Sequence, residues 1–197
     1  GIRDRSVSRG LGEVYKRQDG NVENANLETM CDNIFSTYGI GHRYPNSNPY
    51  IITIKGKIRG FWCYTKHITS LDVSGCPALT SLRCYGNNLT SLDVSKNTAL
   101  TKLSCGNNSL TSLDVSKNTA LTSLDCGNNS LTSLDISKNT ALTYLRCGNN
   151  NLSASALNKI FNDLPINDGN IYFNDNPGTD TCDKRILDYK RWECNCR

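Results

Sequence analysis

The stretch from Ile68 to Asn151 repeats one 21-residue phrase four times. Each copy joins an 11-residue part to a 10-residue part, for example LTSLDVSKNTA followed by LTKLSCGNNS between Leu89 and Ser109. We call these parts the long half and the short half, and one complete copy a coil. Self-similarity at a fixed period of roughly 20 to 50 residues is typical of solenoids and arrays, and it outweighs local propensity. The chain is therefore predicted to be a stack of equivalent coils.

Both halves share the form L-x-x-L-x-(V/C)-x-x-N, with apolar residues at positions 1, 4 and 6 and asparagine at position 9. The step from position 4 to position 6 has the period of a strand, so both side chains face inward. Stacked coils would then place like residues about 4.8 Å apart in ladders. The ladder of inward cysteines contains Cys63, Cys84, Cys105, Cys126 and Cys147. The ladder of turn asparagines contains Asn87, Asn97, Asn108, Asn118, Asn129, Asn139 and Asn150, and we expect their amides to satisfy backbone groups.

This pattern resembles the leucine-rich repeat family, in particular the short-repeat, internalin-like form found in bacterial surface proteins. The resemblance covers roughly residues 58–151. It implies an α/β solenoid, right-handed, with 21-residue coils, parallel β-sheet and helical caps at both ends. The half that forms the concave sheet is left open by the pattern. The short half fits better, because its next leucine falls at position 11 and completes LxxLxCxxNxL.

The first 18 residues do not fit this design. Residues 8–18, SRGLGEVYKRQ, resemble a translated transposase sequencing adapter, except that Glu13 stands where the adapter gives Asp. We therefore interpret residues 1–18 as a non-native segment of a metagenomic reading frame and leave them out of the fold. The natural N-terminus, with any export signal, is then expected to be missing. This segment also carries +3 of the formal charge of +4, so the remainder has no basic character that favours nucleic acid.

The remaining chain is predicted to be one domain in three parts. Residues 19–57 form an N-terminal cap with an amphipathic helix over 25–38 and a strand over 50–55. The alternative role of this helix is to bind a partner. Residues 58–151 form the repeats. Residues 152–197 form a C-terminal capping coil with a helix from Ser153 through Leu164 and a short helix over 182–190. No apolar run is long enough to span a membrane.

The ladder cysteines have three possible roles: free buried thiols, a disulfide within the ladder, or a metal site. Free thiols are favoured, because a buried thiol behaves as a small hydrophobe and no C-x-x-C pair with zinc spacing occurs. At the C-terminus, Cys182 could pair with Cys194 or Cys196 if the protein is exported. An aspartate ladder on the long halves also suggests calcium, but each carboxylate has hydroxyl and lysine neighbours. We predict no metal and no cofactor.

The outward positions of the two halves differ. Those of the long halves hardly change between coils, whereas those of the short halves vary and carry the aromatic and arginine side chains that are enriched in binding hot spots. Neutral drift of one face is the alternative. The predicted partner-binding residues on the varied face are Trp62, Tyr64, Arg83, Tyr85, Lys102, Asp125, Tyr144 and Arg146.

No catalytic motif is present, and the two histidines fit surface or cap positions better than catalysis. The sequence therefore predicts a non-catalytic, monomeric module that binds a protein or a glycan. The resemblance implies a secreted or cell-surface bacterial protein that mediates adhesion. A structural spacer in a larger surface protein is the main alternative, and a fragment of a leucine-rich repeat enzyme is a weaker one.

Overall fold

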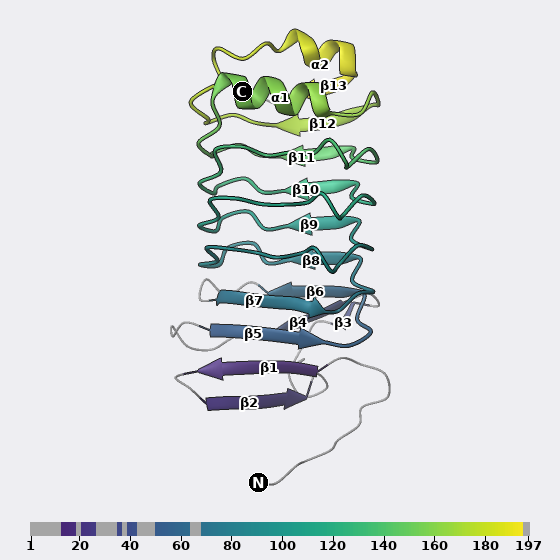
Figure 1. Ribbon diagram of the computed structural model, residues 1–197, viewed down its shortest axis with the longest axis vertical. Helices are drawn as coiled ribbons and strands as arrows, with labels where there is room; N and C mark the ends of the chain where they lie inside the picture. Colours follow the sequence, from purple (N-terminus) through teal and green to yellow (C-terminus); the bar gives the residue numbers. More distant parts are fainter. Residues whose placement is uncertain are drawn as a thin grey trace.

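The computed structural model describes residues 13–18, 21–26, 35–36, 39–42, 50–63 and 68–194. Within these residues the coils stack along one long axis (Figure 1). Strands of successive coils pair in parallel and in register, so that position 3 of one short half lies beside position 3 of the next. The strands of this part of the stack are β6 (Gly60–Cys63), β8 (Ser81–Arg83), β9 (Lys102–Ser104), β10 (Ser123–Asp125), β11 (Tyr144–Arg146), β12 (Gly169–Tyr172) and β13 (Trp192–Cys194).

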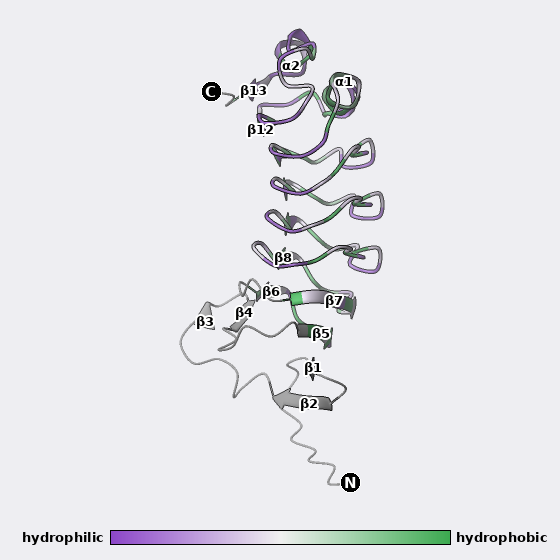
Figure 2. Ribbon diagram, turned by 90° about the vertical axis from the view of Figure 1, so that its left-hand side faces the viewer, coloured by the Kyte–Doolittle hydropathy of each residue, from purple (hydrophilic) through white to green (hydrophobic). Residues whose placement is uncertain are grey.

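The short half forms the sheet, as its pattern favours. The long halves from Leu89 onward form turns instead, on the opposite side of the stack (Figure 2). In these turns the Asp93 Oδ1 accepts a hydrogen bond from the Ser95 N–H at 2.8 Å. The long half that precedes them is different, since β7 (Ile68–Gly75) pairs in parallel with β5 (Tyr50–Lys55) in a second sheet.

The core is the interior of the stack. Positions 1, 4 and 6 of both halves are buried, and each leucine so buried contributes about 1.5–3 kcal/mol. The ladder cysteines at position 6 of the short half lie in this core as free thiols: Cys63, Cys84, Cys105, Cys126 and Cys147. Burial raises the pKa of Cys147 to about 12, so that it stays a neutral thiol at ordinary pH.

The asparagines at position 9 join each coil to the one before it. In the short half, Asn108 donates from Nδ2 to the carbonyls of Cys84 and Cys105, each at 3.0 Å, and accepts from the Leu89 N–H at 3.0 Å. In the long half, Asn118 donates only to two carbonyls of the preceding coil. The same pattern holds along both columns: Asn87, Asn129 and Asn150 follow Asn108, while Asn97 and Asn139 follow Asn118.

Position 8 of the short half requires a left-handed backbone. Its residues have φ between 52° and 72° and are Gly86, Asn107, Asn128, Asn149 and Asp175. Only glycine, and asparagine or aspartate at modest cost, adopts this region readily. This explains why these five positions hold only glycine, asparagine or aspartate.

At the C-terminal end, α1 (Ala154–Asp163) covers the last coil. Its cap is Ser153, whose Oγ accepts from the Ala156 N–H at 3.2 Å. Phe161 packs against Phe173 with ring centroids 4.8 Å apart. A second, shorter helix follows as α2 (Arg185–Lys190). Neither of these helices, nor any other in the described part of the chain, is long and apolar enough to cross a membrane.

The pairing of Cys182 with Cys194 or Cys196, one expected possibility, does not form. Cys182 is a free thiol whose Sγ donates to the Thr179 carbonyl at 3.3 Å. Cys194 is disulfide-bonded, so its partner is another cysteine.

The helix expected over residues 25–38 is wrong where the structure describes this segment. Its first residues belong to β2 (Asn21–Asn26) and its later ones to β3 (Phe35–Ser36), while 27–34 and 37–38 lie outside the described residues. The reason is pairing: β3 forms an antiparallel pair with β4 (Gly39–His42), which joins the main sheet beside β6. Backbone hydrogen bonds to neighbouring strands outweigh a local helical pattern.

Leaving residues 1–18 out of the fold is also wrong in part. Residues 13–18 form β1 (Glu13–Gln18), which is antiparallel to both β2 and β5. Asp-Gly separates β1 from β2 in the sequence, which is the strongest short-range signal for a hairpin. The adapter-like origin of this segment stays a prediction.

Candidate binding face of the parallel sheet

The outward face of the short-half sheet carries positions 3, 5 and 7. These side chains face away from the core because Leu at position 4 and Cys at position 6 face into it. The parallel register sets neighbours directly side by side. At position 5, Asp125 lies between Ser104 and Arg146, and at position 3, Ser123 lies between Lys102 and Tyr144.

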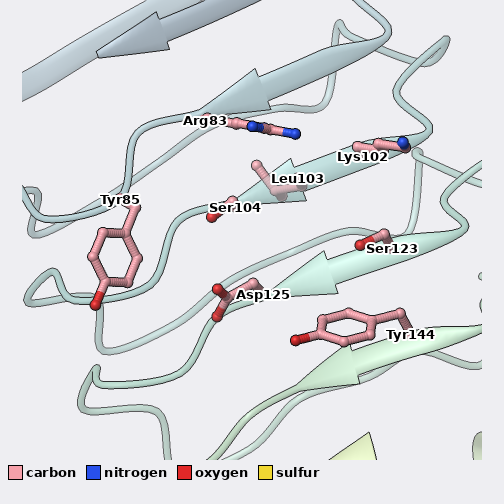
Figure 3. A pocket seen from close by; sticks show the side chains of 8 residues that line it. All are labelled: Arg83, Tyr85, Lys102, Leu103, Ser104, Ser123, Asp125 and Tyr144. Atoms are coloured by element: carbon pink, nitrogen blue, oxygen red, sulfur yellow. The ribbon is translucent and has the colours of Figure 1, made fainter. Parts of the chain in front are cut away.

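Two hollows open on this face. The first has a volume of about 340 Å³ and contains five of the predicted binding residues. Tyr85 and Tyr144 stand on either side of Asp125, while Arg83 and Lys102 project from β8 and β9 (Figure 3). Its full lining is Arg83, Tyr85, Lys102, Leu103, Ser104, Ser123, Asp125 and Tyr144.

The second hollow, of about 370 Å³, begins on the other side of Tyr144. Tyr144 and Tyr172 form an aromatic wall here, with ring centroids 5.6 Å apart and planes tilted by 44°. The full lining is Asn128, Tyr144, Arg146, Gly148, Asn149, Tyr172, Asn174 and Asp175. Because Tyr144 lines both hollows, they are adjacent along the axis of the stack.

Asp125 is the most enclosed charged group of the face, with 19% of its side chain exposed. Its Oδ1 accepts from the Gly127 N–H at 3.2 Å, and its Oδ2 lies 3.9 Å from the Arg146 guanidinium. Burial nevertheless dominates and raises the pKa of Asp125 above its usual value. The pKa of Tyr144 is raised as well, first by burial and then by the Asp125 carboxylate.

Glycine at position 7 gives the face its depth. A Cβ on Gly106 would come within 2.9 Å of the Gly127 carbonyl and 3.1 Å of the Tyr85 ring, and one on Gly148 within 2.9 Å of the Asn174 carbonyl. A side chain at Gly106 or Gly148 would therefore press against the next coil. Tyr85, which takes position 7 one coil earlier, lies over Gly106 and forms one edge of the first hollow.

The remaining predicted residues lie as follows. Trp62 is at the N-terminal end of the face, where the Arg83 guanidinium lies 5.5 Å from its ring centroid. It does not line either hollow, and Tyr64 is outside the described residues. Sequence reasoning missed Tyr172 and Asn174. Since Ile171 and Phe173 continue positions 4 and 6, extending the register by one coil places both at outward positions 5 and 7.

The aspartate column of the long halves has a structural role. Each carboxylate accepts from the backbone N–H two residues later, at 2.8 to 2.9 Å, for Asp72, Asp93, Asp114 and Asp135. These backbone hydrogen bonds are the main cause that lowers the pKa of Asp93, Asp114 and Asp135. Among the described residues no group of three or more His, Cys, Asp or Glu could hold a metal ion.

Comparison with known proteins identifies the class of fold. The family model described as Leucine Rich repeats (2 copies) matches residues 98–139, and the search of curated proteins finds no match. Among solved structures, an internalin, InlF from Listeria monocytogenes, is 23% identical over 70% of this chain and 40% of its own, with a TM-score of 0.59. A leucine-rich repeat protein from Leptospira interrogans is 18% identical over 71% of this chain and 46% of its own, with a TM-score of 0.50.

A third structure is the functional domain of InlJ from Listeria monocytogenes, which is described as including a cysteine ladder. It is 30% identical over 68% of this chain and 36% of its own, with a TM-score of 0.47. The chain thus spans less than half the length of each of these structures. The fold is that of a leucine-rich repeat solenoid with internalin-like structural neighbours.

Proposed function

We propose that the chain is a non-catalytic binding module that recognises a protein or glycan ligand through the outward face of its short-half sheet. The observation that carries this proposal is the gathering of Arg83, Lys102, Asp125 and Tyr144 around one hollow. Tyrosine and arginine are the residue types that most often dominate binding energies. Their backbone is held in register by the ladders, so these side chains project from a rigid support.

We further propose that this module belongs to an exported bacterial protein and that it acts as a monomer at the cell surface or after secretion. The likeness of its fold to internalins supports this. So does the disulfide of Cys194, because disulfides persist mainly in oxidising compartments. A spacer within a larger surface protein is the second candidate.

The two candidates differ in what happens when the face is changed. Immobilised wild type, a Tyr144→Ala/Arg146→Ala variant and a Ser112→Ala/Lys117→Ala control on the long half would be exposed to host-surface and bacterial-envelope extracts. A binding module retains components that the first variant loses and the control keeps. Loss of a dominant contact costs about 2 kcal/mol or more, a roughly 30-fold fall in affinity.

Circular dichroism and thermal unfolding would show that both variants remain folded. Retention of the same components by wild type and the Tyr144→Ala/Arg146→Ala variant would contradict binding through this face. Retention of nothing by any of the three proteins would favour the spacer.

A further inference from the structure

The two hollows are polar, with aromatic edges. Leu103 is the one aliphatic side chain among the residues that line them. The exposed large hydrophobic residues of the described chain lie elsewhere, at Ile51, Ile166 and Tyr189. A typical protein–protein interface has a fully buried apolar centre, and neither hollow offers one among its described lining residues.

The usual modes of peptide binding also fit poorly. An extended peptide adds as a strand to an open sheet edge, but β9, β10, β11 and β12 are each paired on both sides. An amphipathic helix needs a hydrophobic groove, which these hollows do not provide. The described face is suited instead to a ligand that makes hydrogen bonds and lies against aromatic rings.

Charge is distributed unevenly between the hollows. Arg83 and Lys102 both line the first, and neither forms an ion pair with a described residue. The carboxylate beside them is Asp125, so the two cations leave this hollow one net positive charge. In the second hollow, Arg146 and Asp175 carry opposite charges. The first hollow therefore favours an anionic group, and the second a neutral one.

The second hollow also has hydrogen-bonding groups to spare. Asn149 donates from Nδ2 to the Asn128 Oδ1 at 2.6 Å, which fixes both amides. The Asn128 Nδ2 and the Asn149 Oδ1 make no hydrogen bond with described residues, so an amide nitrogen with two N–H donors and a carbonyl oxygen acceptor remain for a ligand. Beside them, Tyr144 and Tyr172 present ring surfaces whose apolar faces can cover a sugar ring.

We propose that the two hollows are successive subsites for a linear acidic oligosaccharide. Its anionic group lies between Arg83 and Lys102, and the chain crosses Tyr144 so that a neutral sugar rests in the second hollow. This inference rests on the proposed function and names its ligand class. From β9 to β12 the sheet extends over three strand spacings, about 14 Å, so the ligand is longer than a single sugar.

The test uses matched pairs of sugars that differ only in charge. Sialyllactose is compared with its methyl ester, and an oligogalacturonate with its methyl ester, by titration calorimetry at low and high salt. A tetraglutamate peptide tests an acidic peptide as the alternative ligand. We expect binding of at least one acidic sugar, and binding of its neutral counterpart at least 10-fold weaker, because a hydrogen bond to a charged group is lost. High salt should weaken the acidic complex.

Two variants assign the subsites. Arg83→Gln/Lys102→Gln should lower the affinity for the acidic sugar at least 10-fold. Lys96→Gln/Lys117→Gln makes an equal change of charge on the long halves and should bind the acidic sugar as wild type does. Tyr144→Ala should also lower the affinity for the acidic sugar, because both hollows lose a wall.

Several results would overturn the inference: equal binding of acidic and neutral sugars, tighter binding of the peptide, equal losses in the control, or no binding of any acidic sugar. If no sugar binds while the Tyr144→Ala/Arg146→Ala variant still loses a protein from the extracts, the glycan inference fails and the proposed function stands. If neither experiment shows binding, both fail.

Discussion

Asn118 and Asn150 occupy equivalent positions in the two kinds of half-coil, yet they should differ in their contribution to stability. Asn118 is fully buried and donates to the carbonyls of Val94 at 3.0 Å and Asn97 at 2.9 Å, but its Oδ1 has no partner in the described structure. Asn150 is 5% exposed and donates to two carbonyls at 3.1 Å. Its Oδ1 in addition accepts from the Leu131 N–H at 2.9 Å.

Replacement by alanine therefore has different costs at the two sites. Each buried group left without a partner costs about 1–3 kcal/mol. Asn118→Ala removes two hydrogen bonds of about 1 kcal/mol each, but the carbonyls of Val94 and Asn97 still accept from backbone N–H groups and the unpaired Oδ1 is removed as well, so the net loss should be below about 2 kcal/mol. Asn150→Ala also removes its bonds to two carbonyls that keep other donors, and in addition it leaves the Leu131 N–H without a partner, so its loss should be about 4 kcal/mol.

Urea unfolding at 25 °C, followed by circular dichroism, measures both losses of stability, provided that the slope of the free energy of unfolding against urea concentration is the same in the variants as in wild type. For a chain of this size each kcal/mol lowers Tm by roughly 2–4 °C, which gives a second measurement. Thr119→Ala, an exposed change next to Asn118, is the control and should cost less than about 0.5 kcal/mol. Equal losses at the two asparagines, or a larger loss for Asn118→Ala, would refute this accounting of the hydrogen bonds.

Two further predictions concern titratable groups. Burial raises the pKa of Cys76 to about 11 and that of Cys147 to about 12, so neither thiol should react with iodoacetamide at pH 8 until the protein unfolds. Mass spectrometry of native and urea-treated samples measures this reaction. Alkylation of either thiol in the native protein would contradict the prediction. Because burial raises the pKa of Asp125 above 3.8 in the folded state, its ionised form costs stability at pH 7, and that cost disappears as the pH falls through the raised pKa. Asp125→Asn should thus have a higher free energy of unfolding than wild type at pH 7, and urea unfolding should show that this difference shrinks towards pH 3.5. A difference that grows instead would mean that the pKa of Asp125 is lowered on folding.

The repeat predicted the stack because its signal is summed over many coils. The apolar spacing of the short half, with Cys105 two residues after Leu103, predicts a strand, and the same spacing one coil later predicts its neighbour. The long half has the same apolar spacing, yet it forms turns from Leu89 onward and a strand only at β7, although Asp72 and Asp93 make the same hydrogen bond. What distinguishes β7 is its pairing with β5, which periodicity does not express.

Outside the repeats each segment occurs once, so no such summation helps. The pattern over residues 25–38 fits a helix by spacing alone, yet β3 pairs with β4 and so joins the main sheet. At the candidate site, sequence placed Tyr144 and Arg146 on the outward face. It could not reveal that Tyr144 forms a wall shared by two hollows, because each hollow is lined by side chains from at least three successive coils.

The contrast between a constant and a varied face has two separate physical causes. Aspartate recurs at position 5 of the long half because its carboxylate accepts the hydrogen bond that bends each turn, so a change there costs stability. On the sheet, the backbone of the short half is already fixed by its strand pairing and by asparagines such as Asn108, so Arg83 or Asp125 can change without loss of fold. Variation of the sheet face is therefore what stability alone would permit. The case for binding depends instead on where the varied residues converge, at two hollows that share Tyr144.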